Sequence, residues 1–191
     1  MEICRKVAEW MAGYDRPWGI AGGWAIDLFI GNQTRAHSDI EIAILREDQH
    51  LIKNHLTCWK FDKVVNGELV NWGHEMLELP IHELHGKHVG TGEALEVLLN
   101  EIDRERWVFR RATKITYPVS SLFLISGEGI PVLNPVIVLL YKAKNAQEKD
   151  HADFQVVKDL LETHDKEWLL QALEIHLPGH PWISVLQGGV E

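Results

Sequence analysis

The chain has 191 residues, 46% of them hydrophobic and 25% charged, which suits a soluble protein that buries a sizeable core as one domain or a compact pair of subdomains. With 19 Lys and Arg residues against 28 Asp and Glu, the net charge of −9 argues against tight nonspecific binding of duplex nucleic acid, where phosphate neutralisation dominates affinity. Two cysteines make no disulfide framework or zinc signature, MEICRKVAEWM is not typical of a signal peptide, and no apolar run reaches the ~20 residues of a membrane span. We therefore expect a cytoplasmic protein with neither nucleic-acid nor membrane partners.

Short helical and strand patterns alternate over the first 130 residues. Amphipathic or apolar periodicity predicts helices over residues 2–11, 24–30 and 47–59. Apolar β-prone runs predict strands over residues 18–21, 38–45, 79–84 and 94–101. Two hairpins are predicted, one over residues 60–72 with Asn66-Gly67 at its turn and one over residues 106–118.

The pattern changes near residue 130. Three helices are predicted over residues 134–144, 149–164 and 166–176, whereas the tail over 177–189 is broken by Pro and Gly and is predicted to be irregular. The sequence thus predicts an α+β fold, a small mixed β-sheet flanked by helices with a C-terminal helical segment. Residues 1–130 form the predicted sheet-containing domain and residues 131–191 the helical segment.

A glycine pair and an acid pair flank the helix predicted over residues 24–30. On a strand, Asp39 and Glu41 share one face, and two carboxylates this close repel unless a cation neutralises them. Magnesium suits such oxygen ligands, which it combines with substrate phosphates. A turn at Gly22 and Gly23 before a helix lets a phosphate approach backbone N–H groups. Either feature alone is more often structural, but the combination predicts nucleotide chemistry.

The segment written GGWAID…G…TR.H.DIE resembles the signature of the polymerase-beta-like nucleotidyltransferase superfamily, and more closely its aminoglycoside and lincosamide branch, known for antibiotic resistance. The resemblance is strong over residues 18–46 and looser beyond them. It implies that the turn's backbone holds a nucleoside triphosphate and that the acid pair holds magnesium, with Glu41 standing where Asp is more usual. The residues assigned to the nucleotide by this resemblance are Gly22, Gly23, Trp24, Arg35 and Lys142.

The same resemblance implies a third carboxylate on a neighbouring strand, which completes the metal site and acts as general base on an acceptor hydroxyl. Glu96 is the preferred candidate, because an acid between Leu and Val inside a strand is costly without a partner. Glu101 is the second candidate. The structural alternative is an edge strand that leaves Glu96 in water.

Basic residues and histidines remain open in the sequence. Lys142 is preferred as the triphosphate lysine, while Lys144 and Lys149 are equally consistent with a solvated helix end. Arg110 and Arg111 are expected to alternate faces, one toward the acidic region and one toward solvent. The histidines at 82, 85 and 88 fit turn or substrate-edge positions better than a zinc site, since on a strand they alternate faces.

The implied reaction transfers a nucleoside monophosphate, as AMP from ATP, to a hydroxyl of a small-molecule acceptor, with two magnesium ions. Nine acids against two bases between residues 68 and 105 suit an aminoglycoside-like cation, although a solvated face explains them equally. Two alternatives stay open. The chain could be a weakly active or inactive nucleotide-binding regulatory module, as the Glu residues at 41 and 96 would favour, or a minimal nucleotidyltransferase of the toxin–antitoxin type that modifies a protein.

Overall fold

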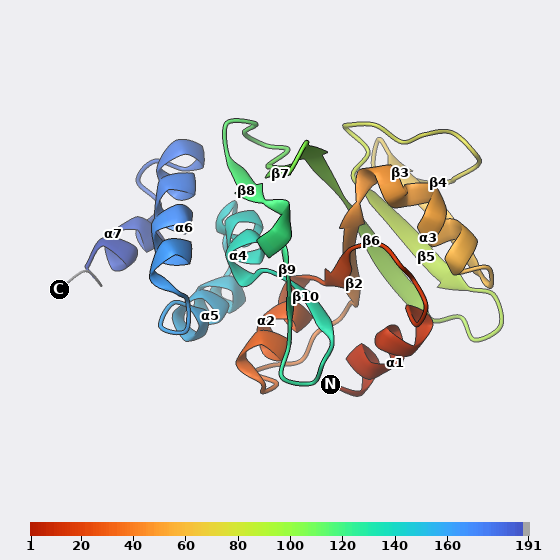
Figure 1. Cartoon of the computed structure of the whole chain (residues 1–191), viewed down its shortest axis with the longest axis horizontal. Helices are drawn as coiled ribbons and strands as arrows, with labels where there is room; N and C mark the ends of the chain where they lie inside the picture. Colours follow the sequence, from red (N-terminus) through yellow and green to blue (C-terminus); the bar gives the residue numbers. More distant parts are fainter. Residues whose placement is uncertain (189–191) are drawn as a thin grey trace.

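A mixed β-sheet forms the centre of the computed structural model, which describes residues 1–188 (Figure 1). The strand order is β4-β3-β5-β6-β2-β1-β10-β9, and β7 and β8 extend the sheet from β6. The strands are β1 Trp18–Ile20, β2 Glu41–Leu45, β3 Trp59–Val65, β4 Glu68–Asn71, β5 Glu83–His88, β6 Ala94–Asp103, β7 Arg106–Val108, β8 Thr116–Pro118, β9 Phe123–Ile125 and β10 Pro131–Leu133. The α-helices of these residues are α1 Glu2–Trp10, α2 Gly22–Ile30, α3 Gln49–His55, α4 Pro135–Ala143, α5 Glu148–Val157, α6 Thr163–His176 and α7 Pro181–Gln187.

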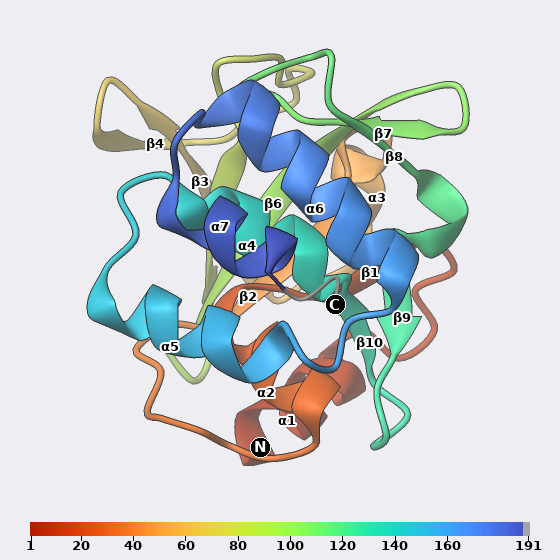
Figure 2. The same ribbon diagram turned by 90° about the vertical axis from the view of Figure 1, so that its left-hand side faces the viewer.

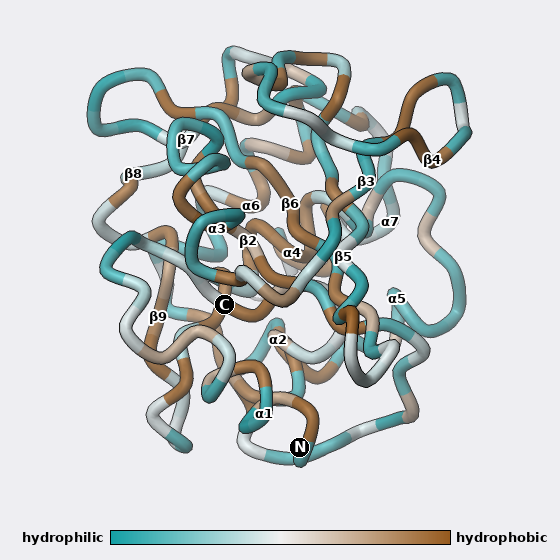
Figure 3. The backbone as a smooth tube through the Cα atoms, turned by 90° about the vertical axis from the view of Figure 1, so that its right-hand side faces the viewer, coloured by the Kyte–Doolittle hydropathy of each residue, from teal (hydrophilic) through white to brown (hydrophobic). Residues whose placement is uncertain are grey.

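Two parallel pairs lie at the middle of the sheet. Strand β2 pairs parallel with β6, and β1 pairs parallel with β10, while the other pairs are antiparallel. The most hydrophobic stretches of the chain follow the central strands, and the peripheral loops are hydrophilic (Figure 3). This arrangement confirms the predicted α+β fold with a mixed sheet and flanking helices.

The helices pack at opposite ends of the molecule. At one end, Trp10 of α1 packs edge-on against Trp59 of β3, with ring centroids 4.8 Å apart. At the other end, α4 to α7 form a helical layer (Figures 1 and 2). There Trp182 of α7 stacks on Phe154 of α5 at 4.3 Å. Several of the eight tryptophans are therefore core residues.

Local sequence explains most of the element boundaries. Gly31 ends α2 in the left-handed conformation, with φ 77°, and Asn134 begins α4 because its side chain accepts a hydrogen bond from the Val136 N–H. The hairpin at Asn66-Gly67 forms as predicted, with φ of 54° and 83° at its two turn residues.

Several predicted boundaries were wrong. The helix predicted over 149–164 divides into α5, which ends at Val157, and α6, which begins at Thr163, and the strand predicted over 79–84 corresponds to β5, which begins only at Glu83. The tail is not irregular: α7 begins at Pro181, which occupies a first-turn position where no N–H is needed, and the His180 side chain caps it. Only residue 189 of the predicted tail lies outside the described residues. The helix predicted over 47–59 ends at His55, because Trp59 joins the sheet. Asp39 precedes β2 instead of lying inside it.

The predicted boundary near residue 130 stays a prediction. Strand β10 lies just beyond it and still pairs with β1, so the helical layer begins at Pro135. Within residues 1–188, no helix is both long and apolar enough to span a bilayer.

Candidate active site

A cavity of about 260 Å³ opens where α2, the start of β2 and α4 meet. Most of the site residues predicted from the sequence line it, namely Gly22, Gly23, Arg35, Asp39, Glu41 and Lys142. These residues come from segments more than 100 positions apart, so the fold brings the predicted glycine turn, acid pair and lysine to one place. We call this space the first cavity.

The two acids of the motif have few partners inside the protein. The Asp39 carboxylate accepts a hydrogen bond from the Ser38 hydroxyl at 2.5 Å. Within residues 1–188, no hydrogen bond or ion pair reaches the carboxylate of Glu41. Burial, and then the charge of Glu96, raises the pKa of Glu41 to about 6, although Lys142 opposes the change. Glu41 is therefore a half-buried acid whose negative charge is poorly compensated.

Glu96 lies directly opposite Glu41 in the parallel pairing of β6 with β2, so the two side chains share one face of the sheet. Burial raises the pKa of Glu96, His85 opposes that change, and the charges of Asp39 and Glu83 add to it. Glu96 does not line the first cavity. It lines a neighbouring cavity, which we call the Trp24 cavity, together with Asp39, and Asp39 lines the first cavity as well.

Glu101, the second candidate for the third acid, lies elsewhere. Its carboxylate forms an ion pair with Arg46, and it lines a separate cavity with Leu77 and Met76. Of the two candidates, Glu96 is thus the one that neighbours the acid pair. Its role as a general base stays a prediction.

The glycine turn lies in contact with the acids and with the TR.H segment. Gly22 has φ 60°, and a Cβ on it would overlap the Glu41 carboxylate. A Cβ on Gly23 would overlap the His37 ring and lie 2.6 Å from Nη2 of Arg35. Only glycine fits at either position, which leaves the backbone at the N-terminus of α2 accessible from the cavity.

A buried acid that the sequence reasoning missed orients this segment. Asp27, on α2, is fully buried, and its Oδ2 lies 2.5 Å from Nε2 of His37. Its other oxygen accepts hydrogen bonds from the N–H and the hydroxyl of Thr34. The Trp24 ring packs on His37 with centroids 4.5 Å apart. Asp27 is the acid of the GGWAID motif, and its position inside the apolar run WAIDLFI was the sequence signal that could have identified it.

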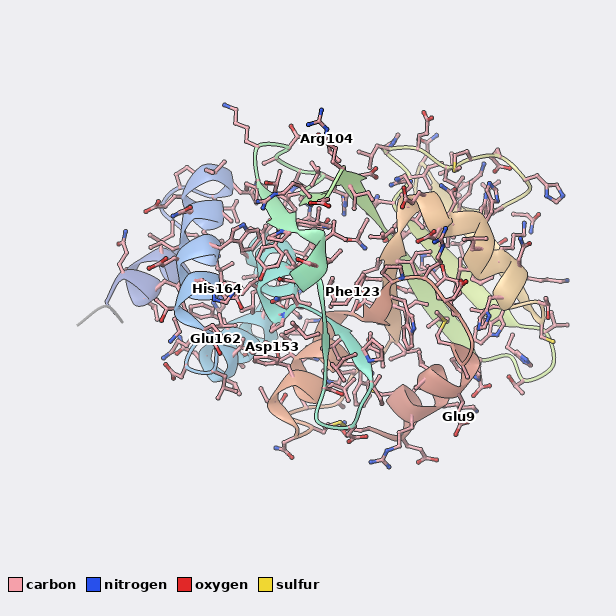
Figure 4. The ribbon with its side chains drawn as sticks, in the orientation of Figure 1. Glu9, Arg104, Phe123, Asp153, Glu162 and His164 are labelled. Atoms are coloured by element: carbon pink, nitrogen blue, oxygen red, sulfur yellow. The ribbon has the colours of Figure 1, made fainter. Side chains whose placement is uncertain are left out.

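Arg35 and Lys142 share the acids of α5. The guanidinium of Arg35 donates to both oxygens of Asp153 at 3.2 and 3.0 Å, and Lys142 lies 2.7 Å from Asp150 and 3.0 Å from Asp153. Burial alone would raise the pKa of Asp153, but the hydrogen bonds from Arg35 and Lys142 outweigh it and lower that pKa. Figure 4 labels Asp153 on α5, the helix that packs against α2.

Trp24 and Lys149 line different cavities. Trp24 lines the Trp24 cavity with Glu96 and does not line the first cavity, so its assignment to the nucleotide stays a prediction. Lys149, which the sequence left open, lines the first cavity.

The acids fit a divalent cation, although residues 1–188 contain no preformed group of three His, Cys, Asp or Glu side chains arranged for a metal ion. Magnesium is usually bound by one or two carboxylates, water and substrate phosphates, so a complete protein cage is not required. Asp39 and Glu41 offer hard oxygen ligands beside the turn, and among residues 1–188 no side chain forms an ion pair with either of them.

A family model described as aminoglycoside-2''-adenylyltransferase matches residues 4–157. The chain belongs to this family. The match includes the glycine turn, the acids at 39, 41 and 96, and the α5 acids that bind Arg35 and Lys142. No curated protein sequence matches the chain significantly.

Solved structures of low sequence identity share the fold. The crystal structure of the lincosamide antibiotic adenylyltransferase LnuA, lincomycin-bound, has a TM-score of 0.57 at 18% identity and covers 84% of this chain and 97% of that one. The solution structure of the antibiotic-resistance factor ANT(2'')-Ia has a TM-score of 0.57 at 18% identity, covering 98% and 95%. A crystal structure of ANT(2'')-Ia with adenylyl-2''-tobramycin has a TM-score of 0.53 at 16% identity, covering 98% and 94%. These likenesses confirm the nucleotidyltransferase fold.

Proposed function

We propose that this chain transfers an adenylyl group from ATP to a hydroxyl of a small-molecule acceptor, with magnesium. The observation that carries the proposal is the first cavity, where the Gly22-Gly23 turn, the Asp39–Glu41 pair and Lys142 meet. A phosphate-binding helix start beside uncompensated carboxylates is suited to a nucleotide bound with its metal.

Each residue has a definite task in this reaction. The N–H groups at the start of α2 bind the triphosphate, and Arg35 and Lys142, held by Asp153, lie along the same wall. Asp39 and Glu41 would hold magnesium, which when bound would neutralise charge on the reacting phosphate. Glu96 takes the proton from the acceptor hydroxyl. The Pα–O bond to pyrophosphate breaks as the bond from the acceptor oxygen to Pα forms.

The acceptor lies over the face of β5 and β6 that carries Glu83 and Glu96 and adjoins Glu41. Aminoglycoside-like and lincosamide-like molecules form the reference panel of acceptors, because proteins of the same fold have been solved with lincomycin and with adenylyl-2''-tobramycin. The acids Glu83 and Glu96 share one face of β5 and β6 and add negative charge there.

The test is pyrophosphate release by the purified protein with ATP, magnesium and a panel of hydroxylated acceptors that includes both antibiotic classes. We expect acceptor-dependent release that EDTA abolishes and magnesium restores. Nucleotide binding without release on any acceptor would instead favour the regulatory module, and label transfer from ATP to protein would favour the protein-modifying alternative.

A further inference from the structure

Two arginines meet on one aromatic ring at the edge of the site. Arg110 and Arg111 lie in the loop that joins β7 to β8, and their guanidinium carbons lie 5.5 and 5.2 Å from the centre of the Tyr141 ring on α4. Arg111 also donates a hydrogen bond to the Tyr141 carbonyl at 3.1 Å. The expectation that the two would alternate between an acidic region and solvent was wrong, because the loop turns both toward Tyr141.

Neither arginine has a counter-charge inside the described protein. Among residues 1–188, no carboxylate lies within ion-pair distance of Arg110 or Arg111, whereas Arg5, Arg16, Arg35 and Arg46 each have one. Burial, and then the neighbouring charge of Arg110, lowers the pKa of Arg111. Two half-buried like charges side by side are unfavourable, and an anion between them would relieve the repulsion.

The arginines line a second cavity of about 190 Å³, which adjoins the first and shares Glu41, Leu98, Leu133 and Tyr141 with it. The glycine turn, Arg35, Lys142 and Lys149 line only the first cavity. A nucleotide whose triphosphate lies on the turn therefore leaves the second cavity free for the other substrate. The reactive edge, marked by Glu41, is accessible from both.

We propose that Arg110 and Arg111, supported by Tyr141, form a binding subsite for an anionic group, a carboxylate or a phosphate, on the acceptor. The inference rests on the proposed adenylyl transfer and narrows its acceptor to a hydroxylated molecule that also carries an acid, such as a sugar acid or a sugar phosphate. Planar guanidinium groups bind both kinds of oxyanion through paired hydrogen bonds.

The part of the second cavity that β5 and the residue before it line has a different charge. Glu83 and His82 lie there, and Glu83 is within 3.7 Å of both His82 and His85. The acid of the acceptor therefore faces the β7–β8 loop, and its hydroxyl or amino groups face β5. A polycationic aminoglycoside would bring positive charge to the arginines, so we expect it to be a poor acceptor.

The experiment first fills the nucleotide site and then titrates an anion. Protein saturated with magnesium and α,β-methylene ATP, which cannot transfer its adenylyl group, is titrated with inorganic phosphate by calorimetry. The double variant Arg110→Gln/Arg111→Gln removes both charges, and Arg110→Lys/Arg111→Lys retains them. The matched control is Arg104→Gln, because Arg104 lies in the exposed β6–β7 turn and projects away from the site (Figure 4).

We expect phosphate to bind the wild-type complex and the Arg104→Gln control equally, the Gln double variant at least ~10-fold more weakly, and the Lys variant in between. The affinity for the ATP analogue should change less than about twofold in all of them. Absence of phosphate binding to the wild-type complex, or equal binding by the Gln variant, would overturn the proposal. A loss confined to the ATP analogue would also overturn it, because the arginines would then hold the nucleotide.

A turnover assay supplies the second readout. Glucuronate, glucose and glucosamine present similar hydroxyls with negative, neutral and positive charge, and we expect kcat/KM to fall in that order and the order to be lost in the Gln variant. A preference for glucosamine would contradict the subsite. If the ATP analogue does not bind, the proposed function fails, and phosphate titration of nucleotide-free wild-type and Gln-variant protein still decides whether the anion subsite exists.

Discussion

In each of the two cavities, two cations meet on one side chain, but only the pair in the first cavity, which Lys149 also lines, meets on an acid. In the first cavity, Arg35 and Lys142 both reach Asp153, whose side chain is 2% exposed. In the second cavity, Arg110 and Arg111 share a tyrosine ring, and neither forms an ion pair with an acid of the described residues. Magnesium neutralises much of the negative charge of a bound triphosphate. Arg35 and Lys142 can therefore orient the triphosphate even though Asp153 already neutralises them. An acceptor acid brings no counter-charge of its own, and unpaired arginines suit it.

The difference indicates a division of labour along the central strands. Glu41 borders both cavities, Asp39 borders the first, and Glu96 lies beside Asp39 on the neighbouring strand. The acids therefore stand between the nucleotide and the acceptor. Variants that alter the nucleotide cavity should leave acceptor binding intact, and variants that alter the acceptor cavity should leave nucleotide binding intact.

The largest loss of activity is expected at Asp39, because the proposed magnesium ion that it would hold serves both the nucleotide and the acceptor. Asp39→Asn should lower kcat by at least ~10³-fold, because a magnesium ligand is lost. Asp39 is exposed, and within residues 1–188 its carboxylate bonds only to Ser38, so the melting temperature should stay within a few degrees. Pyrophosphate release and thermal unfolding measure the two quantities. Normal turnover by the folded variant would remove the metal-site argument.

Glu96→Gln should lower kcat by about 10²-fold, since a positioned general base contributes roughly that much. The affinity for an ATP analogue should change little, because Glu96 lies outside the first cavity. Glu101→Gln on the same strand is the matched control and should retain activity, as Glu101 pairs with Arg46 away from the acids. Equal losses in the two variants, or a loss of nucleotide affinity alone, would contradict the assignment.

On the nucleotide side, Gly22→Ala can be compared with Gly13→Ala. Both glycines have positive φ, 60° and 82°, so both substitutions carry a backbone strain of about 1–2 kcal/mol. A Cβ at position 13 meets nothing within 4 Å, whereas one at position 22 overlaps Glu41. We expect nucleotide affinity to fall about 50-fold only in Gly22→Ala, and calorimetry with the ATP analogue measures it. An equal fall in both variants would assign the effect to strain.

Sequence reasoning identified the part of the site that is local in the chain. The glycines, the helix between them and the acids, and the acids themselves lie within 20 residues, and strand pairing brings Glu96 opposite Glu41. It missed Asp153, which binds Arg35 from 118 positions away, because only helix packing joins them. It missed the shared ring under Arg110 and Arg111 for the same reason. In α7, Pro181 was taken as a breaker when it is a helix start.

Glu41 lies between the two cavities, and its carboxylate should cost stability when no metal is bound. Its pKa is raised from 4.5 to about 6, chiefly by burial and then by Glu96. The folded protein thus holds this proton to higher pH than the unfolded chain, so stability is lost as pH rises from about 4.5 through 6. A difference of about 1.5 in pKa corresponds to about 2 kcal/mol, roughly 30-fold in the unfolding equilibrium.

Glu41→Gln should therefore unfold at a temperature about 4–8 °C higher than wild type in EDTA at pH 8, and the gap should close at pH 4.5. The same variant should be inactive. With magnesium and the ATP analogue, wild type should gain more stability than the variant, because ligand binding favours the folded state. A variant that melts below wild type in EDTA at pH 8 would show that the Glu41 charge is already compensated within the protein.

The smallest effect is expected where the cations of the first cavity are held. Asp153→Asn keeps the size of the side chain but removes the charge that fixes Arg35 and Lys142, so both lose their geometry against the triphosphate. We expect the KM for ATP to rise about tenfold with a smaller change in kcat, and the protein to lose about 3 kcal/mol of stability because two cations lose a buried partner. Asp150→Asn removes one contact of Lys142 and none of Arg35, so its effect on KM should be smaller.

Phosphate binding to the nucleotide-filled complex should be unchanged in Asp153→Asn, since Arg110 and Arg111 do not depend on this acid. Loss of phosphate binding there would mean that the two cavities act as one, and the division between a neutralised nucleotide side and an unpaired acceptor side would be wrong.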